Sequence, residues 1–124
     1  MIDTHVLVWL SGAQRRRIPD AVLRRLDSEQ LGLSPFVQLE LAFLYEIGRI
    51  RLPAHTLIDE LSTRLEMVVA DVSAVAVCTA AAGLTWTRDP FDRLLAAHAD
   101  VARLPLVTSD ETIRRNLSLA WWAE

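Results

Sequence analysis

Residues 85–110 read TWTRDPFDRLLAAHADVARLPLVTSD, and the rest of the chain is organised around this segment. The pair Asp89-Pro90 predicts the start of a helix, because aspartate caps the free backbone N–H groups of a first turn and proline fits the first helical position. The expected helix carries a mostly small, apolar face made of Phe91, Leu94, Leu95, Ala96, Ala97 and Ala99. We expect this face to be packed against other elements.

The end of the same stretch predicts a functional site. Leu106–Thr108 reads as a short buried strand that stops at Ser109-Asp110. Asp110 therefore lies at the carboxyl edge of a sheet, where α/β proteins keep their sites. Asp92 stands in the first turn of the preceding helix. Carboxylates at a strand end and on a neighbouring helix suit a hard divalent cation.

Short strands alternate with helices along the rest of the chain. The expected helices are residues 6–10, 20–28, 35–47, 53–64, 74–82 and 111–116. The expected strands are residues 31–33, 67–69 and 119–122, with Ile2 as the tail of a first strand. This alternation predicts a parallel sheet covered by helices on both faces. Residues 1–124 contain no repeat or linker, so we expect one α/β domain.

The helix expected at residues 35–47 carries an apolar stripe. The stripe consists of Leu39, Phe43, Leu44 and Ile47, and two acids, Glu40 and Glu46, interrupt it. An acid among apolar neighbours is costly unless it is used. Glu40 is therefore a candidate for the site, although a solvated helix residue is the alternative.

Composition and charge narrow the function classes. The chain is 52% hydrophobic, yet it contains no apolar run of the roughly 18–20 residues that span a membrane. One cysteine, Cys78, excludes an internal disulfide, and the start lacks a signal peptide, so we expect a cytoplasmic protein. All 13 basic residues are arginine, but the net charge is −3, which argues against a broad basic face for nucleic acid.

Four acids form the expected site: Asp3, Glu40, Asp92 and Asp110. Asp3 follows the first strand as Asp110 follows a late one, and parallel strands end at the same edge. Clustered carboxylates raise one another's pKa values, so together they imply a cation. Ligands that are all oxygen select Mg²⁺ or Mn²⁺, which could activate a water for attack on a phosphodiester.

Other interpretations of these acids stay open at this point. Asp89 is favoured as a structural cap over a metal ligand. Asp92 could only complement the helix dipole, and Asp110 could cap the helix that it opens. Only two residues precede Asp3, so either the sheet tolerates a very short first strand or the start is truncated.

Four segments together resemble the PIN-domain family, and specifically the VapC-like toxins of bacterial toxin–antitoxin pairs. They are MIDTHVLVWL (1–10), SPFVQLELAFLYEIGRI (34–50), LTWTRDPFDRLLAAHA (84–99) and LPLVTSDETI (104–113), and they cover nearly the whole chain in the family's order. The DPFDR and LVTSD motifs are the most specific. The resemblance implies a three-layer α/β/α sandwich with a central parallel sheet.

The resemblance also implies a function and site residues. It implies an endoribonuclease that depends on Mg²⁺ or Mn²⁺, with the family's acids falling on Asp3, Glu40, Asp92 and Asp110. Thr108 matches the polar residue that orients the last acid. The implied partners are an RNA substrate, an antitoxin that wraps an apolar groove, and a second copy in a homodimer; DNA would be bound only through the antitoxin. The family's first strand is usually longer than Met1-Ile2.

Several further residues are ambiguous. Arg93 could contact the scissile phosphate or pair with Asp89. His5 and His98 are favoured as structural or surface residues over general bases. The run Arg15–Arg17 is favoured as a solvated loop over a surface that tracks an RNA backbone. For Trp86, Trp121 and Trp122, packing in the core or against a partner is favoured over stacking on bases.

Three function hypotheses follow. The first is a metal-dependent endoribonuclease toxin. The alternative is a catalytically weak PIN-fold binding module that acts in an antitoxin-containing, DNA-bound repressor complex. The third, a phosphohydrolase of small phosphates, is disfavoured because the chain lacks a glycine-rich phosphate cradle.

Overall fold

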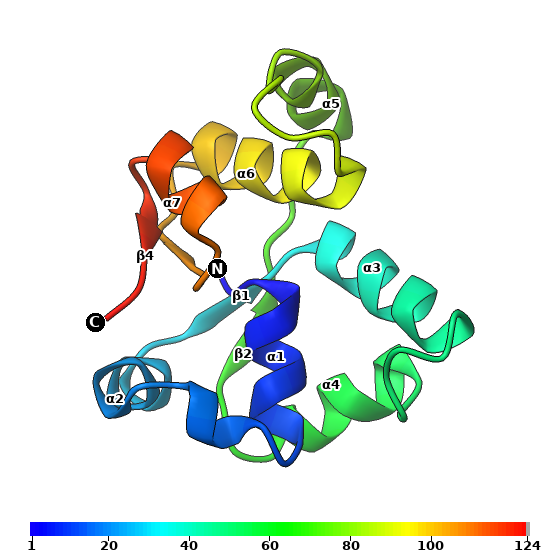
Figure 1. Ribbon diagram of the computed structural model, residues 1–124, viewed down its shortest axis with the longest axis vertical. Helices are drawn as coiled ribbons and strands as arrows, with labels where there is room; N and C mark the ends of the chain where they lie inside the picture. Colours follow the sequence, from blue (N-terminus) through cyan, green and yellow to red (C-terminus); the bar gives the residue numbers. More distant parts are fainter. Residues whose placement is uncertain (124) are drawn as a thin grey trace.

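The computed structural model describes residues 1–123, in which helices alternate with very short strands (Figure 1). The helices are α1 (Thr4–Ser11), α2 (Asp20–Ser28), α3 (Pro35–Glu46), α4 (Ala54–Ser62), α5 (Ala74–Ala82), α6 (Pro90–Ala102) and α7 (Glu111–Asn116), with a 3-10 turn η1 at Arg15–Arg17. The strands are β1 (Leu31–Leu33), β2 (Met67–Val69), β3 (Leu106–Val107) and β4 (Ala120–Trp121). Glu124, the last residue of the predicted domain, lies outside the described residues.

Most element boundaries are those that the sequence predicts. The bounds of α5, β1 and β2 are those predicted, and α2 and α7 agree with their approximate predicted bounds. Most of the other predicted helices and strands differ by one or two residues at one or both ends. The predicted helix starts are confirmed as well, because Ser34, Ser73, Asp89 and Asp110 each accept a backbone N–H in the first turn of their helix. Within residues 1–123, every helix is too short or too polar to span a lipid bilayer.

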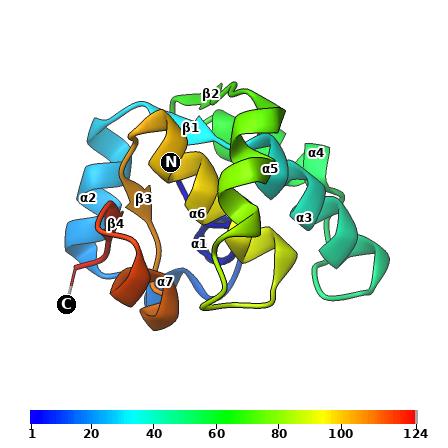
Figure 2. The same cartoon turned by 90° about the horizontal axis from the view of Figure 1, so that it is seen from above.

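The elements form three layers, which confirms the predicted α/β/α class. In Figure 1, α5 and α6 lie above β1 and β2, and α1, α2 and α4 occupy the lower half of the picture on the other side of α6. The view from above in Figure 2 shows α6 crossing over the N-terminus, which lies near the middle of the molecule. Helix α3 contacts both α4 and α6, so it joins the two outer layers at one side of the strands.

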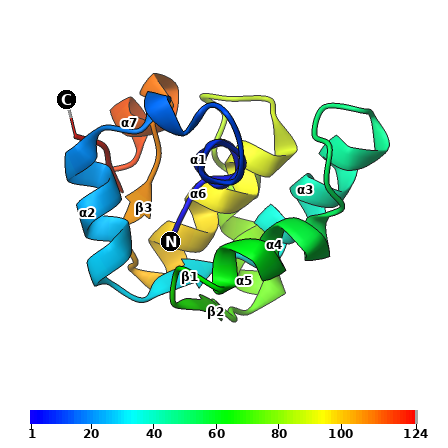
Figure 3. The same ribbon diagram turned by 90° about the horizontal axis from the view of Figure 1, so that it is seen from below.

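The strands form two parallel pairs rather than one continuous ladder. Strand β1 pairs with β2, and β3 pairs with β4. Ile2 forms an isolated parallel bridge with Val107, so the chain start extends the second pair. Within residues 1–123, no backbone hydrogen bond joins residues 1–3 to β1. The N-terminus lies between the two pairs in the view from below (Figure 3).

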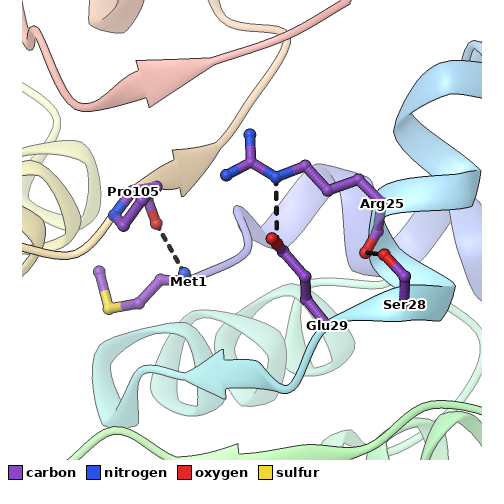
Figure 4. Close-up of polar contacts among 5 residues, drawn as sticks. All are labelled: Met1, Arg25, Ser28, Glu29 and Pro105. Carbon is purple, nitrogen blue, oxygen red and sulfur yellow. Dashed lines mark hydrogen bonds and ion pairs between the residues drawn. The ribbon is translucent and has the colours of Figure 1, made fainter.

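A pocket of about 410 Å³ separates the two strand pairs at the chain start. Its lining includes Met1, Gly32 of β1 and Pro105, which precedes β3. The amino group of Met1 donates a hydrogen bond to the carbonyl oxygen of Pro105 over 2.7 Å, and Arg25 and Glu29 form an ion pair at the rim (Figure 4). Burial lowers the pKa of this amino group. The chain start is therefore hydrogen-bonded to β3 and to the residue that precedes it.

The small, apolar face of α6 is packed against other helices, as the sequence predicts. Leu95, Ala96, Ala97 and Ala99 are all buried, and α6 packs closely on α5 and α3. Because alanine side chains are short, the backbones of two helices can approach each other closely at this face. Phe91 and Leu94, nearer the helix start, are half-buried. The core thus fixes α6, and with it the position of Asp92.

The apolar stripe identified on α3 is not the face of the helix that is buried. Val37 and Leu41 are the buried residues, whereas Leu39, Phe43 and Ile47 are 60%, 45% and 50% exposed. The helix has apolar residues around most of its circumference, so its periodicity could not identify the inner face. Phe43 instead lies against Phe91, with ring centroids 5.9 Å apart. An apolar surface on α3 is therefore open to solvent beside α6.

Three tryptophans pack against the core, which is the role that their sequence positions favoured. Trp86, Trp121 and Trp122 are half-buried and pack against the main core. Arg25 lies over the ring of Trp121 at 4.4 Å, a cation–π contact. Cys78 is exposed on α5.

Candidate active site

Asp3 and Asp110 lie at the same edge of the strands. The N–H of Asp3 donates to the carbonyl oxygen of Val107 over 3.0 Å, next to the Ile2 bridge. Since the chain is parallel to β3 here, Asp3 leaves its strand beside the end of β3. Asp110 follows three residues later in sequence and caps α7, with its Oδ1 accepting the N–H of Ile113 over 2.9 Å.

Thr108 joins these two acids. Its hydroxyl donates to Oδ2 of Asp3 over 2.6 Å and accepts the N–H of Asp110 over 3.1 Å. Thr108 is completely buried and Asp3 is 5% exposed. The threonine therefore sets the orientation of the Asp3 carboxyl group and the backbone position of Asp110 at once.

Glu40 points from α3 toward the start of α1. The hydroxyl of the buried Thr4 donates to Oε1 of Glu40 over 2.5 Å. The start of α3 is fixed in turn by Ser34, which accepts the N–H of Phe36. Glu40 is thus not the solvated helix residue of the alternative interpretation, because a neighbouring element holds its carboxyl group.

Asp92 lies in the first turn of α6 and is half-buried. Asp89 caps this helix, with its Oδ1 accepting the N–H groups of Phe91 over 2.8 Å and of Asp92 over 3.2 Å. The favoured interpretation of Asp89 as a structural cap is confirmed. The carboxylate of Asp89 is also close enough to Asp92 to raise the pKa of Asp92.

The four acids act on one another electrostatically. Burial raises the pKa of Asp3, and the charge of Asp110 raises it further, whereas the Thr108 hydrogen bond and His5 lower it. Burial also raises the pKa of Glu40, with Asp3 and Asp89 adding to the effect and the Thr4 hydrogen bond opposing it. These carboxyl groups therefore share one electrostatic field.

Asp92 shows the largest effect. Its pKa rises to about 7, first because of burial and then because of the charges of Asp89, Asp3, Asp110 and Glu40. Each of the other three predicted site acids thus contributes to the potential at Asp92. A bound cation would offset the repulsion among these carboxylates.

The donor chemistry of the region suits a hard cation, although the side chains do not form a closed cage. Among residues 1–123, no group of three or more His, Cys, Asp or Glu side chains is arranged to hold a metal ion by itself. Mg²⁺ is usually bound by one or two carboxylates, with waters and substrate phosphates completing its shell. A site made of carboxylates that repel one another fits this kind of binding.

Comparison with known proteins identifies the family of this chain. The family model for the PIN domain matches residues 1–116, from the first strand to the end of α7. The chain belongs to the PIN-domain family. It is also 30% identical over 117 residues to Ribonuclease VapC22 of Mycobacterium tuberculosis (strain ATCC 25618 / H37Rv), and the match covers 92% of this chain and 88% of that protein. The chain is therefore a VapC-like PIN-domain protein.

The structure of this PIN domain shows the contacts of the residues whose roles the sequence left open. Arg93 does not pair with Asp89 within residues 1–123; its Nε donates to the carbonyl oxygen of Thr87 over 2.7 Å and holds the segment before α6. His5 is exposed, near enough to Asp3 and Glu40 to lower their pKa values. Arg15–Arg17 forms the exposed turn η1, and Arg17 lies over the ring of Trp9 at 5.3 Å.

His98 is a structural residue of the PIN-domain core. It is fully buried on α6, its Nδ1 lies 2.8 Å from the hydroxyl of Ser34, and its ring meets Phe36 edge-on at 5.9 Å. Burial lowers the pKa of His98. The pair connects the start of α3 with the middle of α6, so it helps to place the helices that carry Glu40 and Asp92.

Sequence reasoning missed Thr4 as a supporting residue. Its contact with Glu40 joins residues 36 positions apart, so local patterns do not reveal it. A weak signal was available, because a small hydroxyl residue directly after Asp3 at the start of a helix points to the same edge as the acid. Thr4 and Thr108 together hold two of the four carboxyl groups.

Replacing Thr108 by valine tests whether these hydrogen bonds matter. The side chains have nearly the same shape, but valine leaves the buried carboxyl of Asp3 and the N–H of Asp110 without their partner. We expect the variant to lose about 1–3 kcal/mol in the free energy of unfolding, measured by urea denaturation. Thr112→Val, at an exposed position on α7, is the matched control. Equal unfolding free energies for the two variants would contradict the role of Thr108.

Proposed function

We propose that this PIN-domain protein is an endoribonuclease toxin of a toxin–antitoxin pair that depends on Mg²⁺ or Mn²⁺. The observation that carries the proposal is the electrostatic field at Asp92, to which Asp3, Glu40 and Asp110 all contribute. The name of the relative, Ribonuclease VapC22, supports RNA as the substrate. The carboxylates come from the start of α1, from α3, from α6 and from the end of β3, as in a site built at a sheet edge.

In this proposal, Asp3, Glu40, Asp92 and Asp110 bind the cation, with Asp89 contributing to the field from the α6 cap. A cation bound by carboxylates and water supplies a water of lowered pKa and neutralises charge on a phosphodiester. No protein side chain then has to serve as the general base, which agrees with the packing of His98 in the core.

The side chains of the PIN domain have distinct tasks in the proposed reaction. Thr108 keeps one oxygen of Asp3 engaged, so the second oxygen is left for binding. Thr4 does the same for Glu40. Arg93 stabilises the loop before α6 through Thr87 and so acts as a positioning residue for Asp92. These hydrogen bonds fix the carboxylates before substrate arrives, which reduces the reorganisation needed during the reaction.

The proposed protein partners follow from the exposed apolar surface. Leu39, Phe43 and Ile47 form a stripe on α3 next to Glu40. An antitoxin segment packed on this stripe would bury apolar area and cover the acids together. We further propose a homodimer in the cytoplasm, with DNA bound only through the antitoxin.

The test is cleavage of a pool of structured RNAs by the purified protein without antitoxin. We expect fragments with Mg²⁺ or Mn²⁺ and none when EDTA is present, because carboxylates without a cation repel the phosphate backbone. Gel analysis of the labelled pool would also identify the substrate. A folded protein that cuts no RNA in either cation would contradict the nuclease, and the alternative of a binding module in an antitoxin-containing repressor complex would then lead.

A further inference from the structure

A second pocket lies at the opposite end of α1 from the acids. It has a volume of about 430 Å³ and is formed by the end of α1, the turn that follows it, and the segment between α3 and α4. Val8, Ile50, Leu52 and Leu57 contribute apolar surface, and Arg49 and Arg51 contribute two guanidinium groups. This volume is in the range of pockets that bind small organic groups.

The charged side chains that line this pocket are all positive. No acidic residue lines it, and Arg49 and Arg51 are both exposed. Within residues 1–123, neither of these side chains takes part in an ion pair or a hydrogen bond. Some exposed arginines, such as Arg103 and Arg115, pair with an acid on their own helix, whereas others, such as Arg24, are unpaired within residues 1–123. The chain has a net charge of −3, so two unpaired arginines at one pocket form a local positive site.

Helix α1 links this pocket to the proposed active site. Its eight residues span about 12 Å, with Asp3 and Thr4 at one end and the pocket residues Ser11 and Gly12 at the other. His5, near the acids, and Val8, in the pocket, are three residues apart and so lie on the same side of the helix. One face of α1 therefore leads from the acids to the arginines.

We propose that this pocket is a second binding site for the RNA substrate, where Arg49 and Arg51 hold a phosphodiester a few nucleotides from the one that is cut. The inference rests on the proposed nuclease function. Guanidinium groups match phosphate oxygens through their planar set of N–H donors, and the apolar surface of the pocket accepts the adjoining ribose and base. The acids repel the RNA backbone in the absence of a cation, so positive charge at a distance is needed to retain it. An acidic protein segment is the competing occupant.

The experiment measures RNA binding separately from cleavage. A labelled oligouridylate is titrated in EDTA with the Asp92→Asn protein, in which cleavage is expected to be minimal, and with the same protein carrying Arg49→Gln and Arg51→Gln. We expect the arginine changes to weaken binding about tenfold, and the slope of log K against log salt to fall by about 1.4, since each lost phosphate contact contributes about 0.7 for a single strand. Replacing both arginines by lysine is expected to restore most of that slope.

The matched control changes two exposed arginines outside the pocket, Arg24→Gln and Arg103→Gln, which alters the net charge equally. This control is expected to keep the affinity and salt slope of the parent protein. If both double variants bind RNA alike, the pocket is not an RNA site. The pocket is also not an RNA site if the variant that lacks Arg49 and Arg51 binds RNA as the parent protein does but no longer binds an acidic peptide. Failure of the nuclease proposal gives a different result, namely no RNA cleavage by the protein with all arginines present.

Discussion

Replacing Asp92 by asparagine is expected to reduce metal-dependent RNA cleavage at least about a hundredfold, the usual order when one preorganised electrostatic group is removed from an active site. Asparagine keeps the size of the side chain but removes the charge. In the structure, Asp92 is the acid at which the fields of Asp3, Glu40 and Asp110 add up. The variant should also bind Mn²⁺ more weakly, which calorimetric titration would measure without reference to activity.

The control for this variant is Asp100→Asn on the same helix. Asp100 is exposed near the far end of α6 and pairs with Arg103 over 3.1 Å. The two substitutions make the same chemical change on one helix, so the expected contrast between them depends on position alone. Cleavage that falls equally in both variants, or that survives Asp92→Asn, would show that Asp92 does not act in the reaction.

Local signals explain how much of the fold was predictable. Helix starts have short-range causes, since Ser34, Ser73, Asp89 and Asp110 cap helices through N–H groups two or three residues away. The alternation of strands and helices predicted the layered arrangement. The position of Asp110 directly after a strand predicted that it lies at the edge of the sheet. These features do not depend on distant parts of the chain.

Features that depend on distant residues could not be predicted in the same way. The burial of Val37 and Leu41 rather than Leu39 and Phe43 is decided by how α3 meets its neighbours, because either side of the helix is apolar enough for a core. The division of the strands into two pairs likewise depends on where β1 and β3 come to lie.

Long-range contacts also decide how the candidate acids are held. The resemblance to PIN domains supplied Asp3, Glu40, Asp92 and Asp110 as candidates, and their assignment as ligands is still a prediction. Thr4 meets Glu40 across 36 positions of the sequence and Thr108 meets Asp3 across 105. Periodicity reports one element at a time, so contacts between elements lie beyond it.

Without a divalent cation, the Asp92→Asn protein is expected to be more stable than the parent protein at pH 8, and the two proteins are expected to be equally stable only below about pH 4. The reason is that the pKa of Asp92 is raised from 3.8 to about 7 in the folded state. A carboxyl group with a raised pKa contributes fully to the stability of the folded state below the unfolded-state pKa of 3.8, and this contribution is lost progressively as the pH rises from there through about 7. Asparagine is neutral throughout and does not lose it.

The size of the effect is limited by solvent. Asp92 is half-buried, so screening reduces the gain at pH 8 to about 1–2 kcal/mol. For a domain of this size, that corresponds to a rise of about 3–10 °C in the thermal midpoint. The comparison between the two proteins removes the opposite effect of His98, whose lowered pKa makes the folded state less stable as the pH falls. Midpoints in EDTA at several pH values provide the measurement.

Adding Mg²⁺ or Mn²⁺ should reverse the order of the two proteins at pH 8. A cation that binds only the folded state at a hundred times its dissociation constant stabilises it by about 2.7 kcal/mol, which exceeds the cost of the charged Asp92. The parent protein should gain this stability and the Asp92→Asn protein much less of it. If the two midpoints stay in the same order with and without the cation, Asp92 is not a ligand. A reversal would mean that the repulsion among these carboxylates is the cost of a site that is complete only with its cation and substrate.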